Sequence, residues 1–436
     1  MSTLHSQVNK MEMVGIYKDL FIIICLGLLG WGVIRIERIY QYPFFMGSMF
    51  TSFILPQAFA LISKPEQVSL EALQRVLLVS CLCATACWIG YQIRPDPKWL
   101  TKLNTAIDER KLFRAGIVLM ASGLFFTLLL SRTTAATGEN GNWTGLATIY
   151  LNFSQTTQIA LGIFILKFIQ RPNIINFICT VFSAWPLLGA VIIGRRQPTM
   201  TLLVTIGLSL FWVRRLVPPR ILVIIGMLSI AVLIPVLGTL RGDFWNLIFS
   251  GKWQDVLAVS QHAFDNQQKG DLLELRNAAL VMDAVERTGL FGYGTGWWDS
   301  IVLQWVPGQI VGFDFKKSLQ FNLWDKYLNL LKDFYGYKNP AGATFTGIGD
   351  SFVEFSYFGF LSFALIAYIF KHVWISATYY KSTCSRILYL GLVSPTMIAL
   401  THSVGFAIQQ SSFQLIFIGL ALYYSKVKHK YSTEWV

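Results

Sequence analysis

The sequence predicts an all-α, polytopic integral membrane protein. Of its 436 residues, 54% are hydrophobic and only 14% are charged, and the mean hydropathy is +0.51. A soluble domain cannot bury that much apolar surface in its core. Apolar runs long enough to cross a hydrocarbon core of about 30 Å recur along nearly the whole chain. The length therefore accommodates a bundle of spanning helices rather than several soluble domains.

About eleven transmembrane helices are expected from the apolar runs. They cover residues 19–34, 42–62, 73–93, 113–130, 145–166, 174–193, 199–213, 220–239, 350–370, 387–404 and 411–425. The first run follows a segment of mixed charge, and no small-residue cleavage site comes between it and Arg35. We therefore expect it to be a retained helix rather than a removed leader.

The cationic connections between these helices predict the orientation of the chain. If the spans alternate, the connections at 35–38, 94–114, 167–171, 214–220, 371–386 and 426–430 all fall on one side. By the positive-inside rule that side is the cytoplasm, which predicts a cytoplasmic C-terminus and, with an odd number of spans, an outer N-terminus. The net charge of +13 belongs mainly to these connections, so it does not indicate a nucleic-acid partner.

The opposite side carries the large polar segment of the chain. Its connections are 63–72, 131–144, 194–198, 240–349 and a tight turn near 405–410. The chain thus divides into an N-terminal helix bundle at 1–239, a large periplasmic loop or lid at 240–349, and C-terminal helices at 350–436.

The large loop is expected to contain helical structure. Asp271 and Glu274 have the spacing of a capping box, apolar residues recur at helical spacing as far as Val285, and Gly289 ends the run. This predicts an amphipathic helix lying on the rest of the loop or on the membrane surface. The glycine-rich stretch 292–298 is expected to form a turn, and the apolar stretch 305–315 is too short to span.

The residue types argue against cofactor and metal chemistry. Cys81, Cys83 and Cys87 are spaced like ligands, but their apolar surroundings without histidine or carboxylate favour small core side chains. The six cysteines leave the large loop without a disulfide framework. No glycine-rich phosphate loop, metal-spaced cluster or nucleotide-binding segment occurs. The sequence therefore predicts no cofactor and no metal.

Arg195 and Arg196 form the first candidate site. They lie in a short hairpin between two spans on the predicted outer side, where the positive-inside rule disfavours cations. Arginine can snorkel at an interface, but a turn that needs only polarity can use Ser, Asn or Asp. Because a guanidinium keeps its charge and binds phosphate oxygens in pairs, we interpret the two arginines as a phosphate-binding element.

Arg241 stands at the outer end of another predicted helix, close to Asp243. Together with the Arg195/Arg196 hairpin it would form a clamp at one membrane depth, suited to a pyrophosphate. The alternative is that Arg241 and Asp243 form a local ion pair in a turn. For Asp243 we give this ion pair nearly the same weight as a role in the clamp.

Asp350 and Glu354 share one helix face at the point where the large loop enters a span. Carboxylates inside a membrane are costly and indicate function, although an interfacial charge would explain Asp350. His402, near the outer end of a late helix, is a candidate base, and a hydrogen-bonded packing histidine is its alternative.

At these residues the chain resembles the bacterial oligosaccharide repeat-unit polymerases of the Wzy type, the O-antigen polymerase family, and more remotely the O-antigen ligases. The resemblance covers roughly residues 190–360 and the overall topology. It rests on Gly194-Arg195-Arg196, on Arg241, on the stretch 292–307 followed by Lys316-Lys317, and on the passage from Gly349 to Gly359. The chain departs from its relatives at Pro307-Gly308-Gln309, where they tend to have Pro-Arg, and at Gly349-Asp350, where ligases place His-Asn, which leaves the base open.

The resemblance implies a GT-C-like bundle with a periplasmic lid in the bacterial inner membrane. It implies two undecaprenyl-diphosphate-linked oligosaccharides as substrates, polymerised into O-antigen or exopolysaccharide without a metal, with a chain-length regulator and a flippase of the same pathway as partners. The catalytic candidates are Arg195, Arg196, Arg241, Glu354 and Asp350, and the substrate-binding candidates are Asp243, Lys316, Lys317, Thr344, Thr346 and His402. An O-antigen ligase and a flippase or exporter of the same lipid-linked sugars are the alternative functions.

Overall fold

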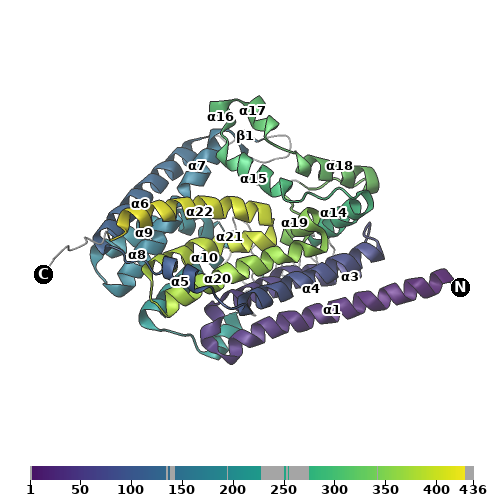
Figure 1. Cartoon of the computed structure of the whole chain (residues 1–436), viewed down its shortest axis with the longest axis horizontal. Helices are drawn as coiled ribbons and strands as arrows, with labels where there is room; N and C mark the ends of the chain where they lie inside the picture. Colours follow the sequence, from purple (N-terminus) through teal and green to yellow (C-terminus); the bar gives the residue numbers. More distant parts are fainter. Residues whose placement is uncertain are drawn as a thin grey trace.

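The computed structural model describes residues 2–133, 136–137, 143–193, 195–226, 250–251, 254, 274–340 and 342–427. Its regular structure is helical except for one pair of two-residue strands, β1 (Ala136–Thr137) and β2 (Trp143–Thr144), which run antiparallel with Ala136 opposite Thr144. The long helices lie side by side along the longest axis of the molecule (Figure 1). The predicted all-α fold class is confirmed for this part of the chain.

Nine helical segments of the described part are long and apolar enough to cross a membrane. The first six come from α1 (Ser2–Ile34), the run of α2 (Tyr42–Met49), η2 (Phe50–Ile54) and α3 (Leu55–Ser63), then α4 (Leu70–Gln92), α6 (Glu109–Arg132), the pair α7 (Leu146–Ser154) and α8 (Thr156–Gln170), and α9 (Ile174–Ile192). The last three come from the run of α19 (Thr346–Phe355), η3 (Ser356–Phe360) and α20 (Leu361–Thr378), then α21 (Thr383–Thr401) and α22 (Val404–Ser425).

The predicted count of eleven spans stays a prediction. The span expected at 199–213 is the helix α10 (Arg196–Arg214), which is not among the nine. The span expected at 220–239 is described only as far as Gly226. Two other expected spans are interrupted: residues 145–166 fall into α7 and α8, and residues 350–370 are broken by η3.

The expected turn near 405–410 is wrong, because those residues are helical. The turn lies at His402 and Ser403, between the end of α21 and the start of α22. The Ser403 hydroxyl accepts a hydrogen bond from the backbone N–H of Phe406 at 2.9 Å. Asp350 accepts two further N–H groups of the first turn of α22. These acceptors satisfy the free N–H groups at the helix start, so Gly405 does not interrupt the helix.

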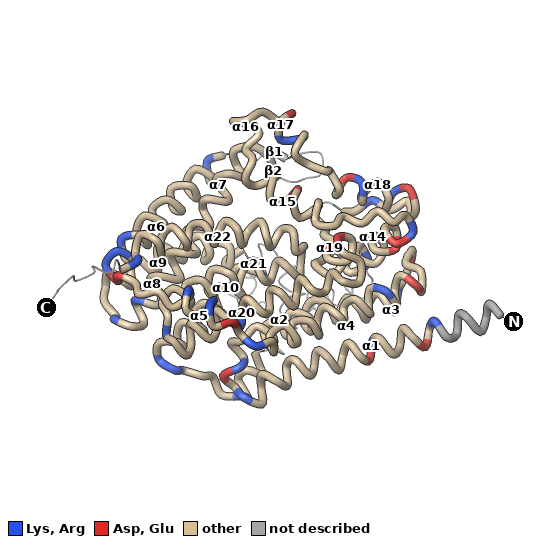
Figure 2. Tube along the Cα trace, viewed as in Figure 1, with Lys and Arg blue, Asp and Glu red and all other residues tan. Residues whose placement is uncertain are grey.

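The cationic connections meet at one end of the molecule, which we call the basic end. Hydrogen bonds join them: Lys371 donates to the carbonyl of Ile93 at 2.9 Å, and Ser382 donates to the carbonyl of Leu103, the last residue of α5 (Pro97–Leu103), at 2.8 Å. Figure 2 shows most Lys and Arg positions gathered toward this end, near the C-terminus. The predicted clustering of the cationic connections is therefore confirmed, and the side of the membrane they face stays a prediction.

The opposite end, which we call the loop end, holds the described part of the large loop. This part forms α14 (Glu274–Thr288), α15 (Thr295–Trp305), α16 (Gly308–Val311), α17 (Phe313–Ser318) and α18 (Leu323–Tyr335). The helix predicted between Asp271 and Gly289 is present as α14, although Asp271 lies outside the described residues. Gly289, with a φ of +69°, follows its last residue as expected.

The helix packs on the rest of the loop through α18, as one of the two predicted alternatives has it, but it does not lie on a surface. All residues of α14 from Leu275 to Val285 are buried, because α3, α4, α18 and α19 pack around it. Its polar residues Arg276, Asn277 and Asp283 are also buried, each with a partner on a neighbouring segment. Both faces of α14 therefore pack against neighbouring segments, and this part of the loop shares one core with the spanning helices.

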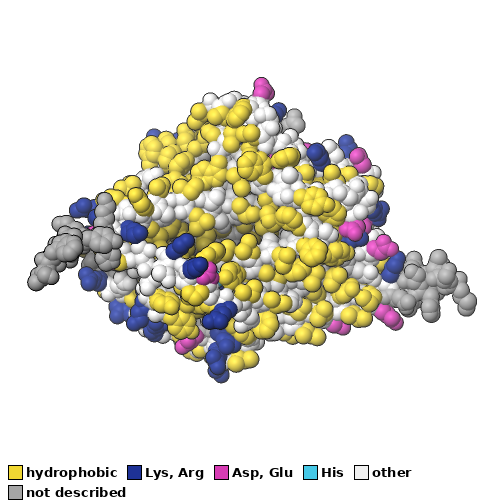
Figure 3. All heavy atoms as spheres, in the orientation of Figure 1, with side chains coloured by type: hydrophobic (Ala, Val, Ile, Leu, Met, Phe, Trp, Pro, Cys, Tyr) yellow, Lys and Arg dark blue, Asp and Glu magenta, His cyan; other side chains and the backbone are white. Residues whose placement is uncertain are grey.

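Apolar side chains cover much of the visible face of the bundle, as expected for helices that meet lipid (Figure 3). Exposed apolar residues occur on α1, α6, α9 and α22, among them Ile23, Val118, Trp185 and Leu420. A surface of this kind cannot face water over such an area, so it indicates a lipid-facing belt.

Candidate functional site

Asp350 connects three helices at the loop end. Its Oδ2 atom accepts hydrogen bonds from the indole Nε1 of Trp297 at 2.9 Å and from the backbone N–H of Val404 at 2.8 Å. The N–H of Gly405 is a third donor at 3.2 Å. Asp350 belongs to α19, Trp297 to α15, and the two N–H groups to α22. The carboxylate thus holds α15 and the start of α22 against α19.

Glu354, one turn further along α19, holds the glycine-rich turn in front of α15. Its side chain is 1% exposed, and its Oε2 accepts the backbone N–H of Gly294 at 2.6 Å. A Cβ atom at Gly292 would lie 2.4 Å from Oε2, and one at Gly296 would lie 2.1 Å from Oε1. A side chain at either position would have to displace the buried carboxylate, which occupies the space where that side chain would begin.

The sequence predicts a single turn over residues 292–298, and the structure differs. The turn ends at Gly294, which has a φ of +90°, and α15 begins at Thr295. A carboxylate at the positive end of a helix is favourable electrostatically, which explains why Glu354 stabilises this helix start. Both carboxylates therefore have acceptor positions in use, and their predicted roles as base or acceptor-orienting groups stay predictions.

Tyr327 of α18 lies close to the same carboxylates. Its hydroxyl donates to the carbonyl of Val353 at 3.4 Å. Burial, together with the negative charges of Glu354 and Asp350, raises the pKa of the Tyr327 phenol well above its ordinary value. The phenol therefore remains a neutral hydrogen-bond donor at physiological pH.

The candidates Thr344, Thr346 and His402 lie at the same end of α21. The Thr344 hydroxyl donates to the carbonyl of Thr401 at 3.0 Å, and the Thr401 hydroxyl lies 2.8 Å from Nδ1 of His402. The ring of His402 stacks over Phe406. Thr346 is fully buried with a φ of +56°, and its hydroxyl accepts the N–H of Gly349 at 3.4 Å. The structure thus brings these three residues together with Asp350.

Arg195 lies at the start of α10, where it is the exposed N-cap residue. The backbone of Arg196 begins the helix, and its side chain lies outside the described residues, as do Arg241 and Asp243. Two residues on, Gln197 donates to the hydroxyl of Ser394 in α21 at 2.7 Å. Seven residues of helix separate Ser394 from the end of α21, a rise of about 10 Å. Arg195 therefore lies at a depth close to that of Ser394, well inside the loop end.

Lys316 and Lys317 belong to α17, and no described contact joins them to Arg195, Asp350 or Glu354. Lys317 is exposed, whereas the ammonium group of Lys316 donates to the carbonyl of Leu303 at 2.9 Å. Burial lowers the pKa of Lys316. The structure therefore does not bring the lysines together with the other candidates.

An ionic cluster beneath α18 has no counterpart among the predicted site residues. Arg75 of α4 pairs with Asp283 of α14 at 3.0 Å, Arg287 pairs with the same carboxylate at 2.7 Å, and Tyr335 donates to it at 2.6 Å. Burial and the hydrogen bond to Asp283 raise the pKa of Tyr335 well above its ordinary value. The signal was available, because Arg75 is an arginine inside a predicted apolar span.

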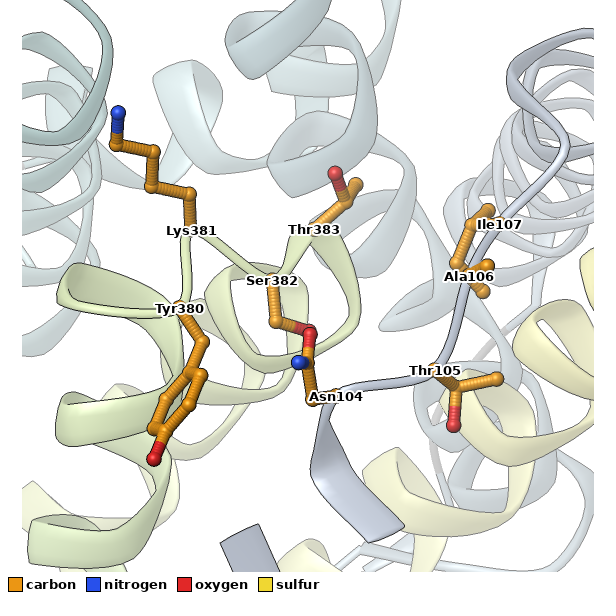
Figure 4. A pocket seen from close by; sticks show the side chains of 8 residues that line it. All are labelled: Asn104, Thr105, Ala106, Ile107, Tyr380, Lys381, Ser382 and Thr383. Atoms are coloured by element: carbon orange, nitrogen blue, oxygen red, sulfur yellow. The ribbon is translucent and has the colours of Figure 1, made fainter. Parts of the chain in front are cut away.

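A pocket at the basic end is lined by two connections, residues 104–107 and 380–383 (Figure 4). It is an open cavity of about 390 Å³, at the opposite end of the molecule from Asp350 and Glu354. Figure 4 shows the side chains of Lys381 and Tyr380 pointing in opposite directions. Among the described residues, no group of three or more His, Cys, Asp or Glu side chains is arranged to hold a metal ion.

The chain was compared with protein-family models, with curated proteins and with solved structures. None of the three comparisons gives a match.

Proposed function

We propose that the chain is a glycosyltransferase that polymerises undecaprenyl-diphosphate-linked oligosaccharide repeat units at the periplasmic face of a bacterial inner membrane. The loop end is the periplasmic end in this proposal, and the basic end is cytoplasmic, as the positive-inside rule expects. The resemblance of residues 190–360 to the Wzy-type polymerases supports the substrate class.

The observation that carries the proposal is the position of Arg195. Four cations at the loop end are paired with carboxylates, namely Lys10, Arg75, Arg276 and Arg287. Within the described part of the chain, no carboxylate forms an ion pair with Arg195. An unpaired guanidinium near a level about 10 Å inside the end of α21 is costly unless an anion or water solvates it there. A lipid diphosphate has the charge and the membrane depth to do so.

The start of α10 strengthens this argument. The first N–H groups of a helix carry a partial positive charge and attract phosphate. Arg195 is the N-cap of a helix of 19 residues, so its side chain and the helix dipole favour an anion at the same place. Arg196 and Arg241 would complete the clamp.

The proposed reaction needs no cofactor. The hydroxyl oxygen of an acceptor sugar forms a bond to the anomeric carbon of the donor glycan, and the bond from that carbon to the diphosphate oxygen breaks. Undecaprenyl diphosphate leaves with the electron pair, and the hydroxyl proton passes to the leaving diphosphate or to solvent. Guanidinium groups at the diphosphate stabilise the developing charge, which is commonly the largest catalytic contribution.

Asp350 and Glu354 act as positioning residues in this proposal. Their oxygens already accept backbone N–H groups from α15 and α22 and from the glycine turn. They therefore fix the floor beneath the acceptor sugar rather than carrying its proton. Thr344 and His402, beside Asp350, are placed to bind sugar hydroxyls.

The decisive experiment supplies purified protein in vesicles with lipid-linked repeat units that are already accessible on both faces. A polymerase yields a ladder of glycans that differ by whole repeat units and remain linked to undecaprenyl diphosphate. A ligase yields no ladder and instead transfers glycan to added lipid A. A flippase or exporter leaves the repeat units unlinked, and this last result would refute the enzymatic proposal.

A further inference from the structure

Helix α15 runs from the loop end into the membrane-spanning layer, alongside α22. At its start, Trp297 contacts Gly405 so closely that a Cβ there would lie 2.9 Å from the indole ring. At its end, the indole Nε1 of Trp305 donates to the hydroxyl of Ser412 at 2.8 Å, and its ring stacks on Phe413 with 6.1 Å between centroids. The helix thus follows the first two turns of α22.

Three spanning helices give the same depth for Trp305. Ser412 lies eight residues from the start of α22, a rise of about 12 Å. Phe413 contacts Phe153 of α7, which is seven residues from the start of that helix, a rise of about 10 Å. Phe153 stacks on Phe126, six residues from the end of α6, a rise of about 9 Å. The end of α15 therefore lies about 10 Å inside the loop end.

The chain then turns and returns to the loop end. Pro307 and Gly312 flank the short helix α16, and α17 follows. On the return, the indole Nε1 of Trp298 donates to the carbonyl of Leu319 at 3.0 Å, and the carboxylate of Asp299 accepts the N–H of Phe321 at 2.8 Å. Residues 295–321 thus form a helical hairpin, closed at its base by contacts to the first turn of α15. Eleven residues of α15 are too few to span a bilayer.

The tip of this hairpin presents apolar side chains outward, next to the exposed charged residues Asp314 and Lys317 of α17. Ile310 is 80% exposed, Phe313 60%, Leu303 58% and Phe315 54%. Figure 1 places α16 and α17 at the outer margin of the molecule, away from the core of the bundle. An exposed cluster of large apolar side chains of this kind indicates contact with a membrane or a partner.

Part of the hairpin backbone is hydrogen-bonded within the hairpin itself. The N–H of Ile310 donates to the carbonyl of Pro307 at 2.9 Å, and the N–H of Gly312 donates to the carbonyl of Gly308 at 2.9 Å. Pro307 has no N–H to satisfy. The ammonium group of Lys316 covers the carbonyl of Leu303 near the end of α15, where a helix leaves carbonyls free.

We propose that residues 295–321 form a re-entrant helical hairpin that enters the leaflet at the loop end and presents Ile310, Phe313 and Phe315 to lipid, with the exposed charges of Asp314 and Lys317 directed to the headgroups. Non-spanning backbone is tolerated at membrane depth when its polar groups find partners within the protein, as the N–H groups of Ile310 and Gly312 do. The inference rests on the register of α15 against α22 and on the exposed apolar tip, and it does not depend on the glycan chemistry.

Site-directed spin labelling tests this arrangement. Single cysteines replace Ile310 and Phe313 in a C384S background, since the other five native cysteines are buried. Two further variants serve as matched references: Leu128→Cys on the exposed face of α6 for lipid, and Lys338→Cys in the exposed loop after α18 for water. The protein is reconstituted into phospholipid vesicles, and collisions of each label with oxygen and with a water-soluble nickel chelate are measured.

We expect the labels at 310 and 313 to match the Leu128 reference, with high oxygen access and at least a tenfold lower nickel access than the Lys338 reference. Nickel access equal to that at Lys338 would place the tip in water and overturn the proposal. Labels reached by neither reagent would place a protein partner over the tip and overturn it as well. Using two positions guards against failure of one variant to fold, which gel filtration of each variant detects.

Discussion

The Oε2 atom of Glu354 accepts a hydrogen bond from the backbone N–H of Gly294 at 2.6 Å, and this contact fixes the turn in front of α15. The two residues are 60 positions apart in the chain, so the contact ties the large loop to the helix that leads out of it. The carboxylate occupies space that Gly292 and Gly296 leave open, because neither glycine has a side chain.

We predict that Gly296→Ala destabilises the protein. A methyl group there would lie 2.1 Å from Oε1 of the buried Glu354, so the turn or the carboxylate must move. Overpacking of this kind costs about 1–3 kcal/mol. The measurement is the thermal midpoint of detergent-solubilised protein. Gly419→Ala is the matched control, since a Cβ at that helical glycine meets nothing within 4 Å. Equal midpoints for both variants would contradict the geometry of the turn.

Asp350→Ala is predicted to destabilise the protein more than Asp350→Asn. Alanine leaves the Trp297 indole and two backbone N–H groups of α22 without an acceptor, whereas asparagine retains one acceptor oxygen. Each hydrogen bond to a charged group contributes about 1.5–3 kcal/mol. Asp333→Ala, at an exposed position on α18, is the control and should be nearly silent. The order of the unfolding midpoints checks the prediction, and the reverse order at position 350 would refute the capping role.

Asp283→Ala is predicted to be among the most damaging substitutions at the loop end. It leaves Arg75, whose side chain is only 14% exposed, without its carboxylate. Removing one partner of a buried pair costs about 3–5 kcal/mol because the remaining charge is uncompensated. Glu71→Ala breaks the exposed pair with Lys10 and should change stability by less than about 1 kcal/mol. Comparable losses of folded protein from the two variants would show that Asp283 is not a buried anchor.

The sequence predicts the helical class and the clustering of cationic connections because both depend on composition and on alternation along the chain. It predicts the end of α14 at Gly289 because a helix end is a local feature. It does not predict that α14 is buried on both faces, since the partners of Asp283 on other helices lie on α4 and at the end of α18. Deleting α14 would therefore remove part of the core and would not isolate a lid function.

The contacts within the candidate site also depend on residues that are distant in the sequence. The spacing of Asp350 and Glu354 places both on one face of a helix, as the structure confirms. The acceptor role of each carboxylate depends on residues about 50 to 60 positions away, which no local pattern contains. Gly292 and Gly296 belong to a glycine-rich stretch in the sequence, and only the packed structure shows that the Glu354 carboxylate occupies the space beside them.

The proposed orientation predicts opposite accessibility of the two ends. In intact cells, a cysteine introduced at Lys338 should react with a membrane-impermeant maleimide, because the loop end faces the periplasm in our proposal. A cysteine at Lys98, on α5 at the basic end, should react only after permeabilisation. Both substitutions are made in the C384S background. Reaction of Lys98→Cys in intact cells would reverse the orientation and remove Arg195 from the periplasmic side.

The most direct test of the proposed site is the rate at which purified Arg195→Lys protein extends lipid-linked repeat units. Lysine keeps the charge at the start of α10 but loses the paired donors of the guanidinium. Losing one donor to a developing oxyanion costs about 2.7–4 kcal/mol, roughly a hundred- to thousandfold in rate. Arg132→Lys, at the exposed end of α6, is the matched control and should extend glycan at the wild-type rate. A loss of at least about a hundredfold in Arg195→Lys alone is the result our proposal predicts. Wild-type ladder formation by Arg195→Lys would contradict the diphosphate clamp.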